Sequence, residues 1–207
     1  VQKVAIECIK QLDILLAEKT DITAIIYVPI NGEFTTKTLL LQNIKIVRKG
    51  RLSGHIWEQF ELPRLIDHGV LLSFGNTAPI GCLLSKNIQT ITMVHDLSYK
   101  YFPAAYSFAF RALYHCLIPA VLKYSTHVVT VSNSERTAIL KHYSGYISNS
   151  RISYLQNGGL SGDPVVVDTP SEKCRANRVL YVGSLTKRKN AEGLIAAAIE
   201  LAKDPDL

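Results

Sequence analysis

Two side chains suited to hydrogen-bonding or proton-transfer chemistry stand together after an apolar run. Residues 89–94 predict a buried strand, and His95 and Asp96 follow it directly. A strand end holds an imidazole at a fixed place, where it can contact a substrate hydroxyl or act near a reacting carbon. The alternative, a core histidine bonded to a backbone group, has about equal weight from the residues alone. For Asp96 we favour a structural role, because aspartate after a strand is a common turn and cap residue.

Cations near the end of the chain form a second candidate site. Residues 178–183 predict a strand with a glycine turn, and Arg188 and Lys189 come just before a helix expected from about Asn190. Cations at a helix N-terminus attract anions through their charge and through the backbone dipole. Lys189, assisted by Arg188, is therefore the best phosphate-binding candidate. Local sequence alone favours the alternative of a solvated basic turn.

Other polar residues end or follow further predicted strands. They are Asn76, Ser132 with the nearby Glu135, and Asn157 with Gly158. The carboxyl ends of parallel strands meet at one edge of a sheet, so these groups would converge on one cleft. Simpler roles stay open, because Ser132 to Glu135 can cap a helix and Asn157-Gly158 can form a tight turn.

Helices and strands alternate along the chain and must position these side chains. Helix patterns occupy residues 1–18, 56–67 (interrupted at Pro63), about 104–124 and 133–143. Strand patterns occupy residues 22–29, 43–49, 70–75, 89–94, 127–132 and 151–159. Most of the strands are continuous apolar runs without in/out alternation, which is typical of a parallel sheet covered on both faces. The sequence therefore predicts an α/β fold, a Rossmann-like parallel sheet with helices on both faces.

Loop composition over residues 161–178 marks a linker, and we expect one domain over 1–172. Residues 173–207 would hold the rest of the linker and the first βα unit of a second Rossmann-like domain. The first domain opens on a helix, without the strand and glycine-rich turn that normally start a doubly wound fold. A lone βα unit cannot bury its own faces. Both features indicate a fragment of a larger protein.

Composition and charge narrow the function classes. The chain has 207 residues, 47% of them apolar and 19% charged, which is ordinary globular composition. Lysine and arginine number 23 against 17 acids, so the net charge is +6. A moderate excess of this kind suits a phosphorylated ligand, a nucleic acid or an anionic membrane, and a solvated basic face keeps about half the weight. The basic residues are scattered and no aromatic-basic motif is present, so nucleic-acid binding is disfavoured.

Cysteine usage and hydropathy point to the cytoplasm. The four cysteines contain no C-x-x-C pair, so no zinc site is implied, and they are typical of a reducing compartment. The first residues already have a helix pattern and not that of a signal peptide. No run of 18 uncharged apolar residues exists, so we expect no membrane-spanning segment.

Six motifs in order resemble the large family of retaining, GT-B-fold glycosyltransferases often called glycosyltransferase group 1. The resemblance covers essentially the whole chain, and it depends on the order of the motifs, since each motif alone is weak. The motifs are IWEQFELPRLI, LLSFGNTAPI, TMVHDLSYKYFP, THVVTVSNSERTAIL, RISYLQNGG and RVLYVGSLTKRKNAEGLIAA.

The resemblance implies transfer of a sugar from a nucleotide-sugar donor to a hydroxyl, with retention of configuration and without a metal or other cofactor. The acceptor would be a glycan or a lipid-linked glycan, in the synthesis of a surface polysaccharide. The N-terminal domain would hold the acceptor and the C-terminal domain the donor, with the reaction in the cleft between them. His95 would contact the donor sugar and Lys189 the donor phosphates. Where the family often has arginine, this chain has Ser184, so part of the phosphate grip is missing or comes from Arg188.

The resemblance also bears on membrane contact and on activity. Some family members use a basic or aromatic surface near the helix 104–124 to touch membranes, which would place the protein at the inner face of the plasma membrane. A core helix with a few exposed cations is the favoured alternative.

The paired-glutamate motif of the donor domain would lie beyond Leu207. We therefore expect the 207 residues alone to be inactive.

Two rival functions remain open at this point. One is a non-catalytic or degenerate module that binds a glycan or a protein partner, and the Gly183-Ser184 departure supports it. The other is a different nucleotide-using α/β enzyme, such as an epimerase or dehydrogenase. That enzyme class predicts a G-x-G-x-x-G turn, and the chain contains none.

Overall fold

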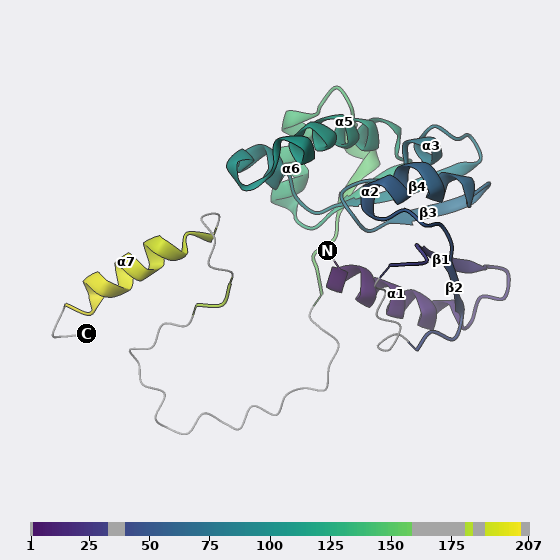
Figure 1. Ribbon diagram of the computed structural model, residues 1–207, viewed down its shortest axis with the longest axis horizontal. Coiled ribbons are helices and arrows are strands. Elements are labelled where there is room, and N and C mark those ends of the chain that lie inside the picture. Colours follow the sequence, from purple (N-terminus) through teal and green to yellow (C-terminus); the bar gives the residue numbers. More distant parts are fainter. Residues whose placement is uncertain (1, 33–39, 159–180, 184–188, 204–207) are drawn as a thin grey trace, which may run out of the picture. The chain divides into compact units, whose positions relative to one another are not determined.

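The computed structural model describes residues 2–32, 40–158, 181–183 and 189–203 (Figure 1). The chain divides into two compact units, Val1–Ser161 and Gly162–Leu207. The predicted domain boundary at residue 172 lies outside the described residues and stays a prediction.

The first unit opens with a helix and a pair of parallel strands. Helix α1 (Gln2–Leu16) is followed by β1 (Ala24–Val28) and β2 (Ile44–Arg48), with Ala24 opposite Ile44. The apolar face of α1 packs on the strand pair through Ile9, Leu16 and Ile44. These elements form where the helical and continuous apolar patterns predict them.

A four-stranded parallel sheet forms the larger part of this unit. Its strands β3 (Gly69–Ser73), β4 (Ile88–Val94), β5 (His127–Thr130) and β6 (Ile152–Tyr154) lie in sequence order. Every neighbouring pair is parallel, so all four carboxyl ends lie at the same edge.

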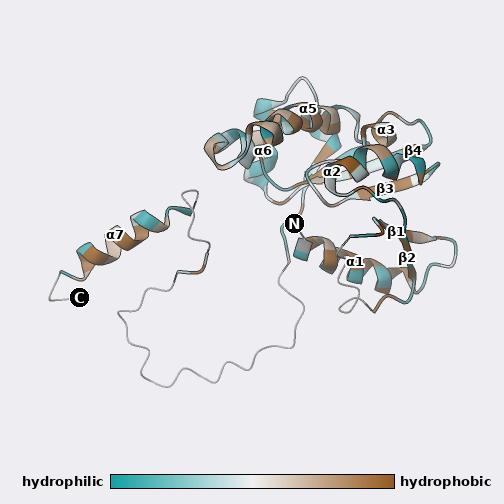
Figure 2. Cartoon of the chain, in the orientation of Figure 1, coloured by the Kyte–Doolittle hydropathy of each residue, from teal (hydrophilic) through white to brown (hydrophobic). Residues whose placement is uncertain are grey.

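Two long helices cover this sheet. Helix α5 (Phe108–Tyr124), which is coloured largely brown for apolar residues in Figure 2, packs on the sheet together with α6 (Asn133–His142). Val94, Ile118 and Val128 are completely buried where they meet. Parallel sheets flanked by helices confirm the predicted α/β, Rossmann-like fold class.

The helix predicted around Pro63 is irregular. A helical turn α2 (Gly54–Ile56) continues as a π-helix, Trp57–Glu61, and then as a 3-10 turn, Leu62–Arg64. Proline has no N–H to donate, which explains why the regular α-helix does not continue through it. Two short helices, α3 (Ile80–Leu83) and α4 (Ser98–Tyr101), were not predicted, because four residues are too few to show a helical period.

The observed strands differ from the predicted sheet in two ways. The described strands form two sheets, β1-β2 and β3-β4-β5-β6, where the sequence predicted one. In β3, Val70 is 59% and Leu72 39% exposed, although the prediction was a strand covered on both faces. β3 is an edge strand of its sheet, and this leaves its apolar side chains partly uncovered.

The second unit contributes one described helix, α7 (Ala191–Leu201). Of the strand predicted over 178–183, residues 178–180 lie outside the described part of the chain, and residues 181–183 are not in a strand. Across the described residues, no helix is both long and apolar enough to cross a lipid bilayer.

Candidate functional site

Four of the predicted site residues follow the carboxyl ends of the four-stranded sheet. Asn76 follows β3, His95 follows β4, Ser132 follows β5 and Asn157 follows β6. Because the strands are parallel, these residues lie along one edge of the sheet, where α/β proteins bind their ligands.

His95 is held in a defined orientation at this edge. Its backbone N–H donates to Asn76 Oδ1 at 2.7 Å, and its ring Nε2 lies 2.8 Å from the carbonyl oxygen of Phe74. A carbonyl oxygen can only accept, so Nε2 carries the proton in this bond. The residue is only 9% exposed, and Nδ1 has no hydrogen-bond partner among the described residues. His95 is thus both a bonded, nearly buried histidine and one with a free acceptor nitrogen.

The turn after His95 is fixed by two carboxylates. Asp96 Oδ1 accepts from the backbone N–H of Ser98 at 2.9 Å. Glu135 Oε1, from the first turn of α6, accepts from the backbone N–H of Leu97 at 2.8 Å. Each of these carboxylates therefore has a hydrogen bond to the backbone of the turn, and for Asp96 this is the structural role favoured from the sequence.

Glu135 lies in an environment that disfavours its charge. Burial raises the pKa of the Glu135 carboxyl and the nearby charge of Asp96 raises it further, while the Leu97 N–H bond lowers it. The net shift is upward.

Ser132 caps α6. Its Oγ accepts from the backbone N–H of Glu135 at 3.1 Å and lies 2.9 Å from Ser134 Oγ. The helix-capping alternative considered for Ser132 to Glu135 is therefore what the structure shows.

Asn157 and Gly158 line a small cavity of about 140 Å³ at the same edge. The other lining residues are Lys3, Val4, Glu7 and Cys8 of α1, Met93 of β4, and Leu155 and Gln156. Lys3 and Glu7 were not among the candidates predicted from the sequence. The signal that could have indicated them is general: in a doubly wound fold, helices begin at the carboxyl edge of the sheet.

Tyrosines and a further acid surround the His95 turn. Burial raises the pKa of the Tyr114 hydroxyl, and the charges of Glu58 and Asp96 raise this pKa further. Glu58 accepts from Thr77 Oγ1 at 2.8 Å. Glu58 is also 2.9 Å from His55 Nδ1, so hydrogen bonds to His55 and to Thr77, in the loop after β3, hold this carboxylate.

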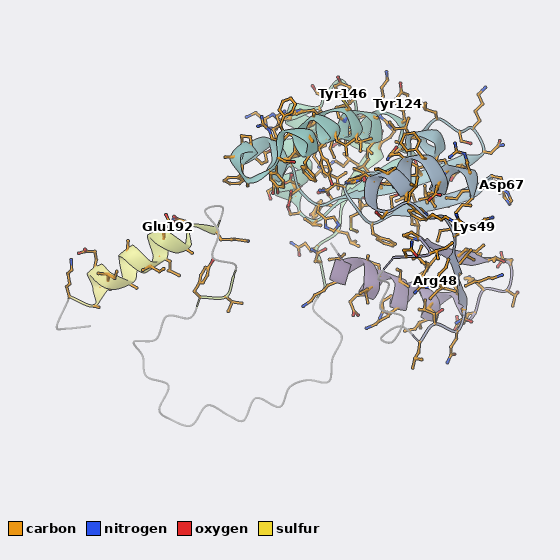
Figure 3. The ribbon with its side chains drawn as sticks, viewed as in Figure 1. Arg48, Lys49, Asp67, Tyr124, Tyr146 and Glu192 are labelled. Carbon is orange, nitrogen blue, oxygen red and sulfur yellow. The ribbon has the colours of Figure 1, made fainter. Side chains whose placement is uncertain are left out.

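The second unit places Lys189 on its surface, just before α7. Asn190 precedes the helix with φ 50°, in the left-handed region. Glu192 lies in the first turn of α7, so a carboxylate shares the helix end with the lysine (Figure 3). The other two predicted phosphate ligands, Ser184 and Arg188, lie outside the described residues.

No metal centre is visible in the part of the chain that the structure describes. Its His, Cys, Asp and Glu side chains form no group of three or more that could hold a metal ion. Metal-independent chemistry remains a prediction.

Comparison with known proteins gives one informative similarity. The chain is 27% identical over 191 residues to the O-antigen chain mannosyltransferase RfbU of Salmonella typhimurium (strain LT2). The matched region covers 87% of this chain and 50% of that protein, so the chain spans about half the length of its relative. No family model matches, and no solved structure matches significantly. The similarity supports a relationship to glycosyltransferases.

Proposed function

We propose that this chain belongs to an enzyme that transfers a sugar from a nucleotide-sugar donor to a hydroxyl of a glycan or lipid-linked acceptor, in polysaccharide synthesis. The similarity to a mannosyltransferase over 87% of the chain carries this proposal. The row of polar groups at the carboxyl edge of a parallel sheet is compatible with it, because ligands bind there. Retention of configuration, metal independence, the GT-B fold and glycosyltransferase group 1 membership are part of the proposal and come from the motif resemblance.

Within this proposal, residues 1–172 form the acceptor-side domain, and residues 173–207 begin the donor-binding domain. The inner face of the plasma membrane, reached from the cytoplasm, is the site of action that suits a lipid-linked acceptor. The nucleotide sugar is a co-substrate, and no nucleic acid takes part.

His95 would contact the donor sugar through Nδ1. With Nε2–H donated to the Phe74 carbonyl, Nδ1 is the acceptor nitrogen of the neutral ring and can receive a hydrogen bond from a sugar hydroxyl. The bonds to Phe74 and Asn76 fix the ring and its backbone before substrate arrives, which is the condition for precise positioning.

Lys189 would bind the donor phosphates. Its ammonium group is exposed and stands at the start of α7, where charge and helix dipole both attract anions. Loss of the leaving nucleotide adds negative charge to the phosphates, so a cation here stabilises the transition state more than the bound donor. The carboxylate of Glu192 weakens this attraction, which makes the lysine charge more important.

The direct test is sugar transfer by the full-length protein, starting with a nucleotide-linked mannose as donor. His95→Ala and Lys189→Ala should each lower kcat/KM by about 10²-fold. The matched control Lys141→Ala removes an exposed lysine of α6 and should change activity less than about twofold. The configuration of the product, read by NMR, tests retention.

Two results would reject the proposal. If both site variants kept full activity, the site assignment would be wrong. If calorimetry showed that the wild-type protein binds nucleotide sugars or glycans but transfers none of the sugars, the non-catalytic module would be the correct function.

A further inference from the structure

The turn from His95 to Ser98 is held by acceptor oxygens from three different segments. Asn76 holds the N–H of His95, Glu135 holds that of Leu97, and Asp96 holds that of Ser98. Asn76 comes from the loop after β3, and Asp96 belongs to the turn itself. Glu135 is the acceptor that joins the turn to a separate helix, 38 residues further along the chain.

Glu135 is itself rigidly placed. Ser132 Oγ accepts from its backbone N–H, so the residue sits in the capped first turn of α6. On the other side of the bond, Leu97 is completely buried. The hydrogen bond therefore connects the start of α6 to the backbone of Leu97, a residue whose side chain is buried. His95 lies two residues before Leu97.

We propose that Glu135 is a positioning residue for His95: by holding the Leu97 N–H, its carboxylate fixes the backbone that carries the imidazole. The N–H groups of His95 and Leu97 are both bonded, so the peptide units between them cannot turn independently. Without Glu135 the Leu97 N–H would lose its acceptor, and the turn would keep the bonds from Asn76 to the His95 N–H and from Asp96 to the Ser98 N–H. The inference rests on the proposed function, because His95 acts on the sugar only within it.

The charge of Glu135 fits this role. A hydrogen bond to a carboxylate is roughly twice as strong as one between neutral groups. Keeping the charge here has a cost, since burial and Asp96 both disfavour it, and Tyr101 is a further titratable neighbour. A residue that only filled space would not require a carboxylate.

The experiment compares E135A and E135Q in the full-length protein, with E18A as the matched control that removes an exposed glutamate. In E135A the Leu97 N–H loses its acceptor, and we expect kcat to fall by about 10²-fold with KM changed less than about threefold. In E135Q the amide oxygen can still accept, so kcat should recover to within about tenfold of wild type. E18A should match wild type.

A second measurement does not depend on sugar transfer. Hydrogen exchange of the Leu97 amide and the ¹⁵N shifts of the His95 ring report the turn directly. E135A should speed the exchange and move the ring shifts, and E135Q should restore both. If wild type transferred no sugar, the proposed function would fail, and these two readouts would still decide the positioning role.

Two outcomes would overturn the inference. Equal loss of activity in E135A and E135Q, with the Leu97 and His95 signals of E135Q restored, would mean that the carboxylate acts on the substrate itself. Unchanged His95 ring shifts in E135A would mean that the contact does not position the imidazole.

Discussion

At the edge of the sheet, side-chain oxygens accept hydrogen bonds from backbone N–H groups. Each N–H left unbonded in a buried turn costs about 1–3 kcal/mol, so nearby carboxylates and amides satisfy them first. Asn76, Asp96 and Glu135 all do so. His95 Nδ1 has no hydrogen-bond partner among the described residues, and it is the atom that we propose for contact with the substrate.

Part of this hydrogen-bond arrangement could be predicted from the sequence. The Ser-x-x-Glu spacing from Ser132 and the turn preference of aspartate are local patterns, and both local roles are seen. The Phe74 carbonyl and the Leu97 N–H are backbone groups from other segments. Their meeting with His95 and Glu135 depends on strand order and register, and a single sequence gives no direct sign of either.

Asp13 offers a pH test at the residue scale. The Gln42 N–H bond holds the pKa of this carboxyl below its ordinary value of 3.8, aided by Asn43 and Ile44 and opposed by burial. A depressed pKa adds stability that is complete above the ordinary value and is lost as pH falls through the folded value. Wild type should therefore lose more thermal stability between pH 7 and pH 3 than Asp13→Asn.

The control for this prediction is Asp21→Asn, which removes an exposed aspartate of the same region. Its change in melting temperature with pH should parallel that of wild type, measured by circular dichroism. Parallel curves for wild type and Asp13→Asn would show that the Gln42 contact does not bind the ionised carboxyl.

Long elements were predictable and short ones were not. The strands β1 to β5 and the helices α1, α5 and α6 lie within a few residues of their predicted bounds, because continuous apolar runs and helical periods extend over many residues. The predicted strand 151–159 is shorter than expected, since β6 ends at Tyr154. The helices α3 and α4 have four residues each, which is too short for a helical period to show in the sequence. Exposure of β3 follows from its place at an edge, which is a property of the sheet and not of the strand's own sequence.

The segment leading into α5 carries the proposed membrane contact. Phe108 is 82% exposed, and Tyr101 and Phe102 are exposed before it. Inserting an aromatic side chain into a lipid interface gains about 1.5–3 kcal/mol, and the net charge of +6 favours anionic lipids. Phe108→Ser should therefore weaken binding of the full-length protein to anionic vesicles about tenfold in co-sedimentation.

Tyr146→Ser is the matched control, because this tyrosine is 43% exposed but lies after α6 (Figure 3). It should leave vesicle binding unchanged. Equal binding by wild type and Phe108→Ser would remove this segment from the membrane contact, and the core-helix alternative would then describe α5.

At the scale of the first unit, each of the two sheets has strand edges that pair with no other described strand. Among the described strands, β1 pairs only with β2, and β3 pairs on one side with β4. Phe74, just after β3, packs against the apolar cluster of Ile9, Leu16 and Ile44, so the sheets share contacts. Unpaired edges with apolar side chains are unfavourable in a soluble domain, and natural proteins cover them.

A parallel strand paired with both β1 and β3 would satisfy the two edges. Lys3 of α1 lines the same cavity as Met93 and Leu155, so α1 begins at the carboxyl edge of the larger sheet. A helix in a βαβ unit starts where its preceding strand ends, and the crossover is right-handed. In the full-length protein, a further parallel strand should therefore pair with both β1 and β3.

Hydrogen exchange of the β1 and β3 amides tests whether this strand is present. In the full-length protein, the β1 and β3 amides should exchange at least about tenfold more slowly than in the 207-residue chain, because a strand paired on both sides opens less often. Amides of β5, already paired with β4 and β6, should change little and serve as the internal control. Equal exchange rates of the β3 amides in both proteins would contradict the prediction and would show that the edge of β3 stays unpaired.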